Sequence, residues 1–130
     1  MNADREFGKL GEESAASFLC GKGFTIIGRN VRLDHKETDI IAKNDKYIVF
    51  VEVKTRRAYP SIMSTRPRPA AAVDYKKRKN LTEGANKYLK KYKDVCEGLQ
   101  PRIDVIEVYA SPDSDKYKVL KIIHMENAVR

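Results

Sequence analysis

Two charged residues inside a short apolar run constrain the fold of this chain more than any other feature. Residues 47–54 read Tyr-Ile-Val-Phe-Val-Glu-Val-Lys, so Glu52 and Lys54 interrupt a run that is otherwise almost entirely apolar. Such a run predicts a central β-strand, in which successive side chains point to opposite faces, so Glu52 and Lys54 share a face with Phe50. An unpaired buried carboxylate or ammonium costs several kcal/mol. The two charges therefore require either an oppositely charged partner or a functional role.

The preceding apolar run supplies a third charge. Residues 39–43 (Asp-Ile-Ile-Ala-Lys) predict a second strand, and the Asn-Asp-Lys sequence at 44–46 is typical of a turn. With a two-residue loop at 45–46, residues pair when their numbers sum to 91, which places Asp39 opposite Glu52. Any loop of even length keeps the two on one face. Carboxylates that close repel each other, and a divalent cation with oxygen ligands would remove the repulsion.

A fourth candidate lies on the first predicted helix, residues 4–22. Glu12 falls on the helix face that also carries Ala15 and Leu19, whereas Glu13 falls off this face. Glu12 is therefore expected on the side that faces the core. The alternative interpretation is an acid at the edge of the apolar stripe that contacts water.

The remaining elements complete a single predicted domain over residues 1–130, with the order α-β-β-β-α-β-β. The long second helix can carry the chain to a fourth strand that lies parallel to the third, through a right-handed crossover. We therefore expect an α/β fold with a mixed sheet and helices on both faces. The predicted elements after the first helix are strands at 24–32, 37–43 and 46–55, a long basic loop at 56–69, a helix at 70–93, and strands at 102–109 and 116–124.

The net charge of +8 is concentrated in one segment. Residues 66–93 hold ten basic and two acidic groups, a net charge of +8, whereas the rest of the chain holds 16 of each sign. A basic face on a neutral body favours a polyanionic partner such as a nucleic acid. The alternative is a solvated helix face that keeps the protein soluble. The predicted nucleic-acid contacts, in this segment and the loop before it, are Arg56, Arg57, Arg66, Arg68, Lys76, Lys77, Arg78 and Lys79.

Other classes of protein are disfavoured. No run is long enough to span a membrane, and the polar N-terminus lacks the apolar region of a signal peptide, so we expect a cytoplasmic protein without membrane contact. Cys20 and Cys96 have no ligand spacing typical of zinc sites, which favours reduced thiols.

Specific motifs carry a resemblance to known families. The Glu-x-Asp sequence at 37–39, followed by the Val-Phe-Val-Glu-Val-Lys-Thr-Arg run at 49–56, resembles the restriction-endonuclease-like nucleases, the PD-(D/E)xK superfamily. Thr38 stands where that superfamily has proline. Over nearly its whole length the chain also resembles the YraN-like bacterial proteins. Further matching pieces are Gly11-Glu12-x-x-Ala15, Gly23-Phe24, Arg29-Asn30, Ala85-x-x-Tyr88-Leu89, Arg102-Ile103-Asp104-Val105 and Glu126-Asn127-Ala128.

The resemblance implies roles for individual residues. Asp39 and Glu52 would bind Mg²⁺ or Mn²⁺ with the help of the Val53 carbonyl. Glu12 would complete the acidic cluster, directly or through a metal-bound water. Lys54 would position or activate the attacking water and offset charge on the scissile phosphate.

Three functions are compatible with these features. The favoured one is a metal-dependent nuclease that hydrolyses phosphodiester bonds in DNA rather than RNA, with branched or structured DNA as a candidate substrate. The second is a non-catalytic nucleic-acid-binding module that retains the nuclease fold. The third is a protein–protein adaptor in which Glu52, Lys54 and Asp39 form a structural ion pair. A homodimer would suit cleavage of both strands, although no residue marks an interface.

Overall fold

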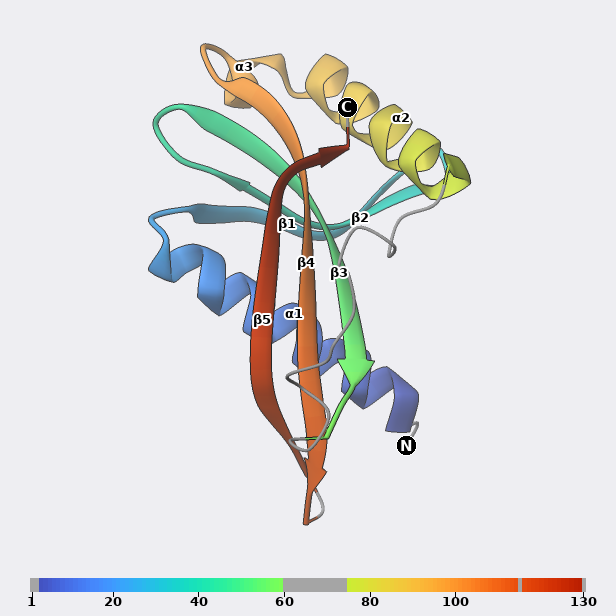
Figure 1. The fold of residues 1–130 in the computed structure, drawn as a ribbon. Helices are drawn as coiled ribbons and strands as arrows, with labels where there is room; N and C mark the ends of the chain where they lie inside the picture. The colour runs from blue at the N-terminus through green and yellow to red at the C-terminus, as the bar shows by residue number, and fades with distance from the viewer. Residues whose placement is uncertain (1–2, 60–74, 115, 130) are drawn as a thin grey trace.

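The predicted order of helices and strands is confirmed by a computed structural model that describes residues 3–59, 75–114 and 116–129 (Figure 1). A short helix, α3, is added before the fourth strand. The elements are α1 (Ala3–Gly21), β1 (Thr25–Leu33), β2 (Lys36–Lys43), β3 (Tyr47–Arg57), α2 (Tyr75–Lys91), α3 (Lys93–Cys96), β4 (Gln100–Asp113) and β5 (Lys116–Val129).

The five strands form one mixed sheet in the order β1-β2-β3-β4-β5. Strands joined by short turns pair antiparallel, whereas β3 and β4 pair parallel because α2 carries the chain back across the sheet. This arrangement confirms the predicted restriction-endonuclease-like mixed sheet. None of the helices in the described parts of the chain combines the length and the apolar character needed to cross a bilayer.

The register of the β2–β3 hairpin agrees with the two-residue loop. Ile40 pairs with Val51 and Lys43 with Ile48, so the numbers of the paired residues sum to 91. The Asn44 side chain fixes the turn, since its Oδ1 atom accepts hydrogen bonds from the backbone N–H groups of residues 46 and 47 at 2.9 and 2.7 Å. Asparagine forms such turns readily because its side chain can replace a backbone acceptor.

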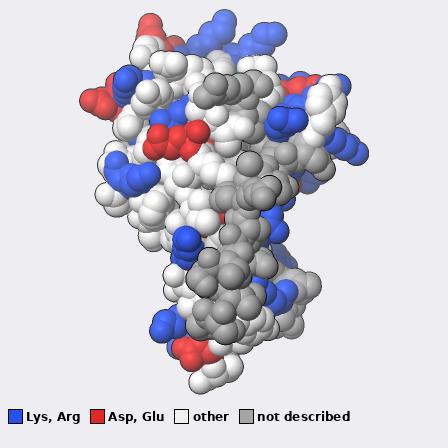
Figure 2. Space-filling model, viewed as in Figure 1, with Lys and Arg blue, Asp and Glu red and all other residues white. Residues whose placement is uncertain are grey.

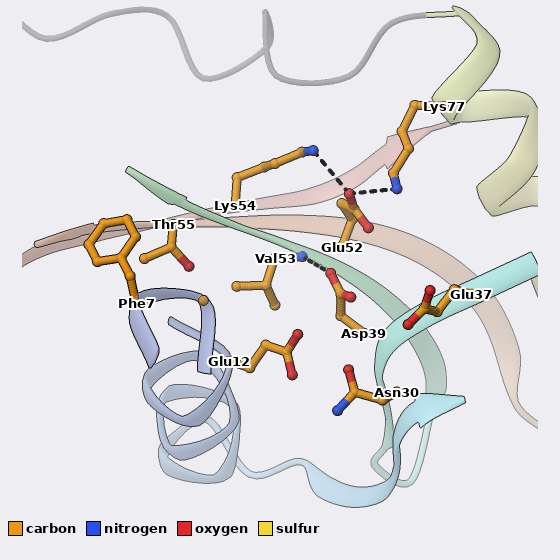
Figure 3. A pocket seen from close by; sticks show the side chains of 11 residues that line it. Phe7, Glu12, Asn30, Glu37, Asp39, Glu52, Val53, Lys54, Thr55 and Lys77 are labelled. Atoms are coloured by element: carbon orange, nitrogen blue, oxygen red, sulfur yellow. Dashed lines mark hydrogen bonds and ion pairs between the residues drawn. The ribbon is translucent and has the colours of Figure 1, made fainter. Parts of the chain in front are cut away.

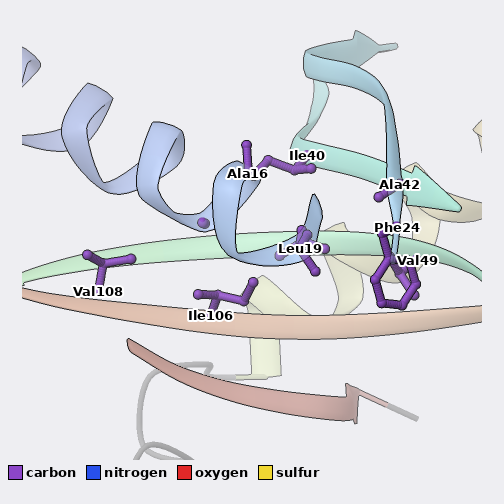
Figure 4. Close-up of a cluster of buried hydrophobic side chains, with 10 residues drawn as sticks. Ala16, Leu19, Phe24, Ile40, Ala42, Val49, Ile106 and Val108 are labelled. Carbon is purple, nitrogen blue, oxygen red and sulfur yellow. The ribbon is translucent and has the colours of Figure 1, made fainter. Parts of the chain in front are cut away.

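Each face of the sheet has its own apolar cluster and its own helix. Leu19 of α1 packs with Val49 and Val51 of β3 on one face (Figure 4). On the other face Phe50 packs with Leu81 and Tyr88 of α2, and the rings of Phe50 and Tyr88 meet edge to face at 5.7 Å. The alternation of β3 side chains between two helices is why residues 48–51 are all apolar.

Strand β3 is longer than predicted. Arg56 and Arg57, which we assigned to a basic loop, continue the parallel ladder, and Arg57 pairs with Ala110 of β4. The prediction was wrong because a neighbouring strand supplies backbone partners that the local sequence does not reveal. The fourth strand likewise extends to Asp113, and it pairs there with Lys116 of β5.

The second helix also differs at its ends. The structure describes it from Tyr75, so the predicted residues 70–74 lie outside the described part of the chain. Leu81, Ala85 and Tyr88 are buried against the sheet. Tyr92, which lay within the predicted helix, is 38% exposed, because α2 ends at Lys91 and the chain turns there into α3.

Candidate active site

A cavity of about 390 Å³ brings together the charged residues that the sequence singled out (Figure 3). Residues from α1, β1, β2, β3 and the first turn of α2 line it, so residues far apart in sequence meet there. The predicted quartet of Glu12, Asp39, Glu52 and Lys54 is present in full. The charged residues of the lining are Glu12, Glu37, Asp39, Glu52, Lys54 and Lys77.

The end of the β2–β3 ladder positions Asp39. The described pairing between these strands stops at Ile40 and Val51. One residue further out, the Asp39 side chain takes over as acceptor: its Oδ2 atom receives the hydrogen bond of the Val53 N–H at 2.8 Å. This hydrogen bond holds the carboxylate at the point where the two strands separate, which is where the cavity opens.

The surroundings of Asp39 disfavour its negative charge. Burial raises the pKa of Asp39 to about 7, and the neighbouring Glu52 carboxylate is the second cause. The Val53 N–H acts in the opposite direction, and Glu12 adds a smaller upward effect. Two carboxylates in a partly desolvated site repel each other and retain a proton more readily than they would in water.

Two lysines neutralise Glu52. Its side chain is only 4% exposed, and its Oε2 atom lies 3.3 Å from Lys54 Nζ and 3.1 Å from Lys77 Nζ. The first contact confirms that Glu52 and Lys54 share a face of β3. The second comes from α2, and the charge distribution had suggested Lys77 only as a nucleic-acid contact. A helical lysine whose partner is a strand residue 25 positions earlier leaves no local signal in the sequence.

A close approach of α1 to β3 brings Glu12 to the cavity. Gly11 makes the approach feasible, because a Cβ atom at this position would overlap the Thr55 hydroxyl and lie 2.8 Å from Thr55 Cβ. Glu12 is half-buried and Glu13 exposed, as the helical periodicity predicted. Glycine permits such a close contact because it has no Cβ atom.

The donor set fits a divalent cation held by two carboxylates. Asp39 and Glu52 provide hard oxygen ligands, and the pKa of Asp39 is raised by burial and by the Glu52 charge, both of which a bound cation would offset. In the parts of the chain that the structure describes, no three His, Cys, Asp or Glu side chains converge closely enough to hold a metal ion. Glu12 therefore lines the same cavity without joining Asp39 and Glu52 in a three-ligand cluster.

A second buried carboxylate beside the site was missed from the sequence. Glu107 of β4 pairs with Lys54 in the parallel ladder, and its side chain is 2% exposed. It accepts hydrogen bonds from Tyr109 Oη at 2.7 Å and from Arg56 Nε at 3.0 Å. The reasoning applied to Glu52, that a charge in an apolar strand needs a partner, would also have singled out Glu107.

The structure places the predicted nucleic-acid contacts in different environments. Lys76, Arg78 and Lys79 are exposed on α2, and Figure 2 shows basic side chains over this part of the molecule. Arg56 is held by Glu107, and the Arg57 guanidinium lies 4.6 Å from the centre of the Phe7 ring. Two further predicted contacts, Arg66 and Arg68, lie outside the described residues.

A family model and individual related proteins both point to the same family. The model of a family described as "Uncharacterised protein family UPF0102" matches residues 11–108. A UPF0102 protein of Caldicellulosiruptor saccharolyticus is 39% identical over 128 residues, covering 95% of this chain and 97% of the relative. Another, from Symbiobacterium thermophilum, is 40% identical over 114 residues, covering 84% and 86%.

The likeness to a solved structure is weaker. The structure of Pyrococcus furiosus SfsA in complex with Ca²⁺ is 19% identical, with a TM-score of 0.43. The match covers 98% of this chain and 65% of that one.

Proposed function

Because this chain belongs to the UPF0102 family, which is described only as uncharacterised, we propose a function from its own site: a metal-dependent nuclease that hydrolyses phosphodiester bonds. The observation that carries the proposal is the pairing of the half-buried Asp39 with the buried Glu52, beside Lys54 in one open cavity. A structural ion pair does not need a second carboxylate whose charge is disfavoured. A phosphodiesterase site needs both the carboxylates and the lysine.

Asp39 and Glu52 would hold Mg²⁺ or Mn²⁺, with the Val53 carbonyl as a further oxygen ligand and Glu12 acting through a bound water. The ion would supply Lewis acidity and lower the pKa of coordinated water. Indirect participation of Glu12 is compatible with its place on the cavity wall, outside any three-ligand cluster.

Lys54 is the positive charge that β3 contributes to the site. Its side chain is 34% exposed and lies beside Glu52 at the cavity, so its ammonium can reach both a water and a phosphate oxygen. Attack of water on phosphorus and departure of the sugar oxygen require alignment and charge stabilisation more than covalent chemistry by the protein. Lys54 would orient the water and offset the charge that develops on the phosphate.

The basic helix supports a nucleic acid as the substrate. The first turn of α2 contributes Lys77 to the cavity, and the exposed Lys76, Arg78 and Lys79 are its neighbours along the helix. A phosphate backbone bound along this helix would therefore pass the carboxylates. DNA is the first candidate because the chain resembles restriction-endonuclease-like DNA nucleases, and branched or structured DNA belongs among the substrates tested.

A second candidate is a nucleic-acid-binding module that does not cut. The observations that favour it are the absence of a three-ligand cluster in the described residues and the occupation of Glu52 by two lysines. Such a protein would use the same basic helix and would bind nucleic acid equally well with or without divalent metal.

The test is a cleavage assay with branched, duplex and single-stranded DNA and with RNA, in Mg²⁺, in Mn²⁺ and with chelator. We expect cleavage that needs metal and that slows at least about 100-fold in both Asp39→Asn and Lys54→Met. Asp45→Asn, which makes the same change of charge in the exposed hairpin loop, serves as the control and should retain activity.

Each other outcome has a distinct meaning. Cleavage that survives both site substitutions would come from a contaminating enzyme and would contradict the proposal. Salt-sensitive binding without cleavage would establish the binding module instead. Absence of both binding and cleavage would favour the structural ion pair.

A further inference from the structure

Lys77 occupies an unusual position for a nucleic-acid contact. Its ammonium lies 3.1 Å from Glu52 Oε2, one of the two carboxylates proposed to hold the metal. Glu52 thus has two lysines on the same oxygen atom, whereas Asp39, at the same cavity, is held by a backbone N–H. The positive charge of the site is concentrated on one of its two acids.

The two lysines differ in how they are tethered. Lys54 lies two residues from Glu52 on the same strand, so the strand geometry places their side chains next to each other on one face. Lys77 approaches from another element, the first turn of α2, and its side chain is 39% exposed (Figure 3). Lys77 can therefore turn from Glu52 towards solvent or towards a bound phosphate without any change in β3.

We propose that Lys77 is a built-in competitor of the metal: it neutralises Glu52 when no cation is bound, and a divalent cation that binds Asp39 and Glu52 displaces it. The displaced ammonium is then available to the phosphate backbone. This inference rests on the proposed function only in taking Asp39 and Glu52 as the cation site.

Displacement couples the two ligands. A cation on Glu52 releases Lys77 for a phosphate, and a phosphate that captures Lys77 leaves Glu52 open to a cation. Each ligand should therefore tighten the binding of the other by the same factor, as linkage requires. The metal site would then be occupied chiefly when the polyanionic partner is bound.

The test is calorimetric titration of Mn²⁺ into the metal-free protein without nucleic acid. Lys77→Met keeps an unbranched side chain only one atom shorter but removes its charge, and we expect it to bind Mn²⁺ roughly 5- to 30-fold more tightly than the wild type. Lys76→Met is the matched control, because it removes one charge from the neighbouring exposed residue of the same helix turn. It should change the affinity less than about twofold.

The outcomes separate this inference from the proposed function. Mn²⁺ binding to the wild type that is unchanged or weakened in Lys77→Met, or tightened equally in Lys76→Met, would overturn the competitor role and leave the metal site intact. Absence of Mn²⁺ binding to all three proteins would overturn the metal site and this inference together. Lys77→Gln, with a circular-dichroism melt of each variant, shows whether any change in affinity comes from altered folding.

A second measurement tests the coupling itself. DNA affinity is compared with Mn²⁺ and with chelator, in a Lys54→Met background that prevents cleavage. Mn²⁺ should tighten DNA binding when Lys77 is present, and most of this gain should vanish in Lys77→Met but not in Lys76→Met. An equal gain in all three proteins would contradict the displacement of Lys77.

Discussion

Asp39 shows how far the surroundings of one residue change its chemistry. Its carboxyl group has an ordinary hydrogen-bond donor in Val53, yet its pKa is raised to about 7 by burial and by Glu52. Near neutral pH the group is therefore divided between its charged and protonated forms. A carboxyl group in this state lowers the stability of the fold, and such groups are common at functional sites, where function and stability conflict.

The raised pKa of Asp39 makes a prediction about stability. Because the folded pKa lies above the unfolded value of about 3.8, the folded state retains a proton that the unfolded chain loses. The stability contribution of Asp39 is full below about pH 4 and is lost as the pH rises to about 7. In chelator, Asp39→Asn should therefore gain stability relative to the wild type across this range, by on the order of 1–3 kcal/mol.

Urea unfolding at several pH values, with Asp45→Asn as the control for charge, checks this expectation. Asparagine can still accept the Val53 hydrogen bond, so the substitution isolates the charge. A difference between wild type and Asp39→Asn that does not change between about pH 4 and pH 8 would contradict the raised pKa.

Glu107 makes a second prediction at the scale of the residue. Tyr109 is fully buried and its hydroxyl donates to Glu107 at 2.7 Å, so Tyr109→Phe leaves the buried carboxylate with one donor fewer. We expect a loss of about 1–3 kcal/mol in the free energy of unfolding. Tyr117→Phe is the control, because among the described residues the Tyr117 hydroxyl has a single long contact, at 3.4 Å with Arg57, and Tyr117 is partly exposed. Equal losses in the two variants would contradict a special role for the Glu107 hydrogen bond.

At the scale of the element, the distance between α1 and β3 decides whether Glu12 reaches the site. Gly11 permits that distance, since the helix meets Thr55 of β3 where a Cβ atom would otherwise lie. The same helix contains Gly8, where a Cβ atom would lie more than 4 Å from every described residue outside its own stretch of helix. Substitutions at the two glycines therefore allow the effect of packing to be compared with the effect of helix propensity.

Alanine substitutions at the two glycines should have opposite effects. Gly8→Ala should raise the free energy of unfolding by up to about 1 kcal/mol, because alanine favours helix. Gly11→Ala should lower it by about 1–3 kcal/mol, because the new methyl group overlaps Thr55, and it should also weaken Mn²⁺ binding by moving Glu12. Thermal and urea unfolding of both variants check this. Stabilisation by Gly11→Ala would show that α1 does not contact β3 so closely.

At the scale of the whole molecule, the charge is distributed asymmetrically. The exposed bases Lys76, Arg78 and Lys79 lie on α2 next to Lys77, which lines the cavity, and the sequence segment that contains them carries the entire net charge of +8. Lysines are also exposed on β5, an edge strand of the sheet, where charged side chains discourage pairing with another chain. Of these two groups, our proposal assigns the α2 bases to the binding of a phosphate backbone.

This asymmetry predicts the salt dependence of nucleic-acid binding. Substitution of Lys76, Arg78 and Lys79 by glutamine should weaken binding and reduce the slope of log K against log salt by up to about 2.7, or about 0.9 per lost phosphate contact. The control replaces the exposed β5 residues Lys116, Lys118 and Lys121, which removes the same charge. Equal reductions in both triple variants would mean that net charge, and not the α2 face, attracts the nucleic acid.

The sequence predicted well where a local rule applied. The period of two along β3 placed Glu52, Lys54 and Phe50 on one face, and the turn residues at 44–46 predicted the β2–β3 register. The helical period distinguished Glu12 from Glu13. Prediction from the sequence failed where residues distant in the chain determine the secondary structure. Arg56 and Arg57 belong to β3 because β4, more than 40 residues later in the chain, extends the ladder.

The sequence by itself thus determined which faces the charged residues occupy, because side-chain direction follows from the backbone geometry of strand and helix. Only the tertiary structure decided how these charges are neutralised. The contact of Lys77 with Glu52, the enclosure of Glu107 by Tyr109 and Arg56, and the raised pKa of Asp39 all depend on through-space distance and burial. Electrostatic energies vary with both quantities, and neither can be read from residues that are separate in the chain.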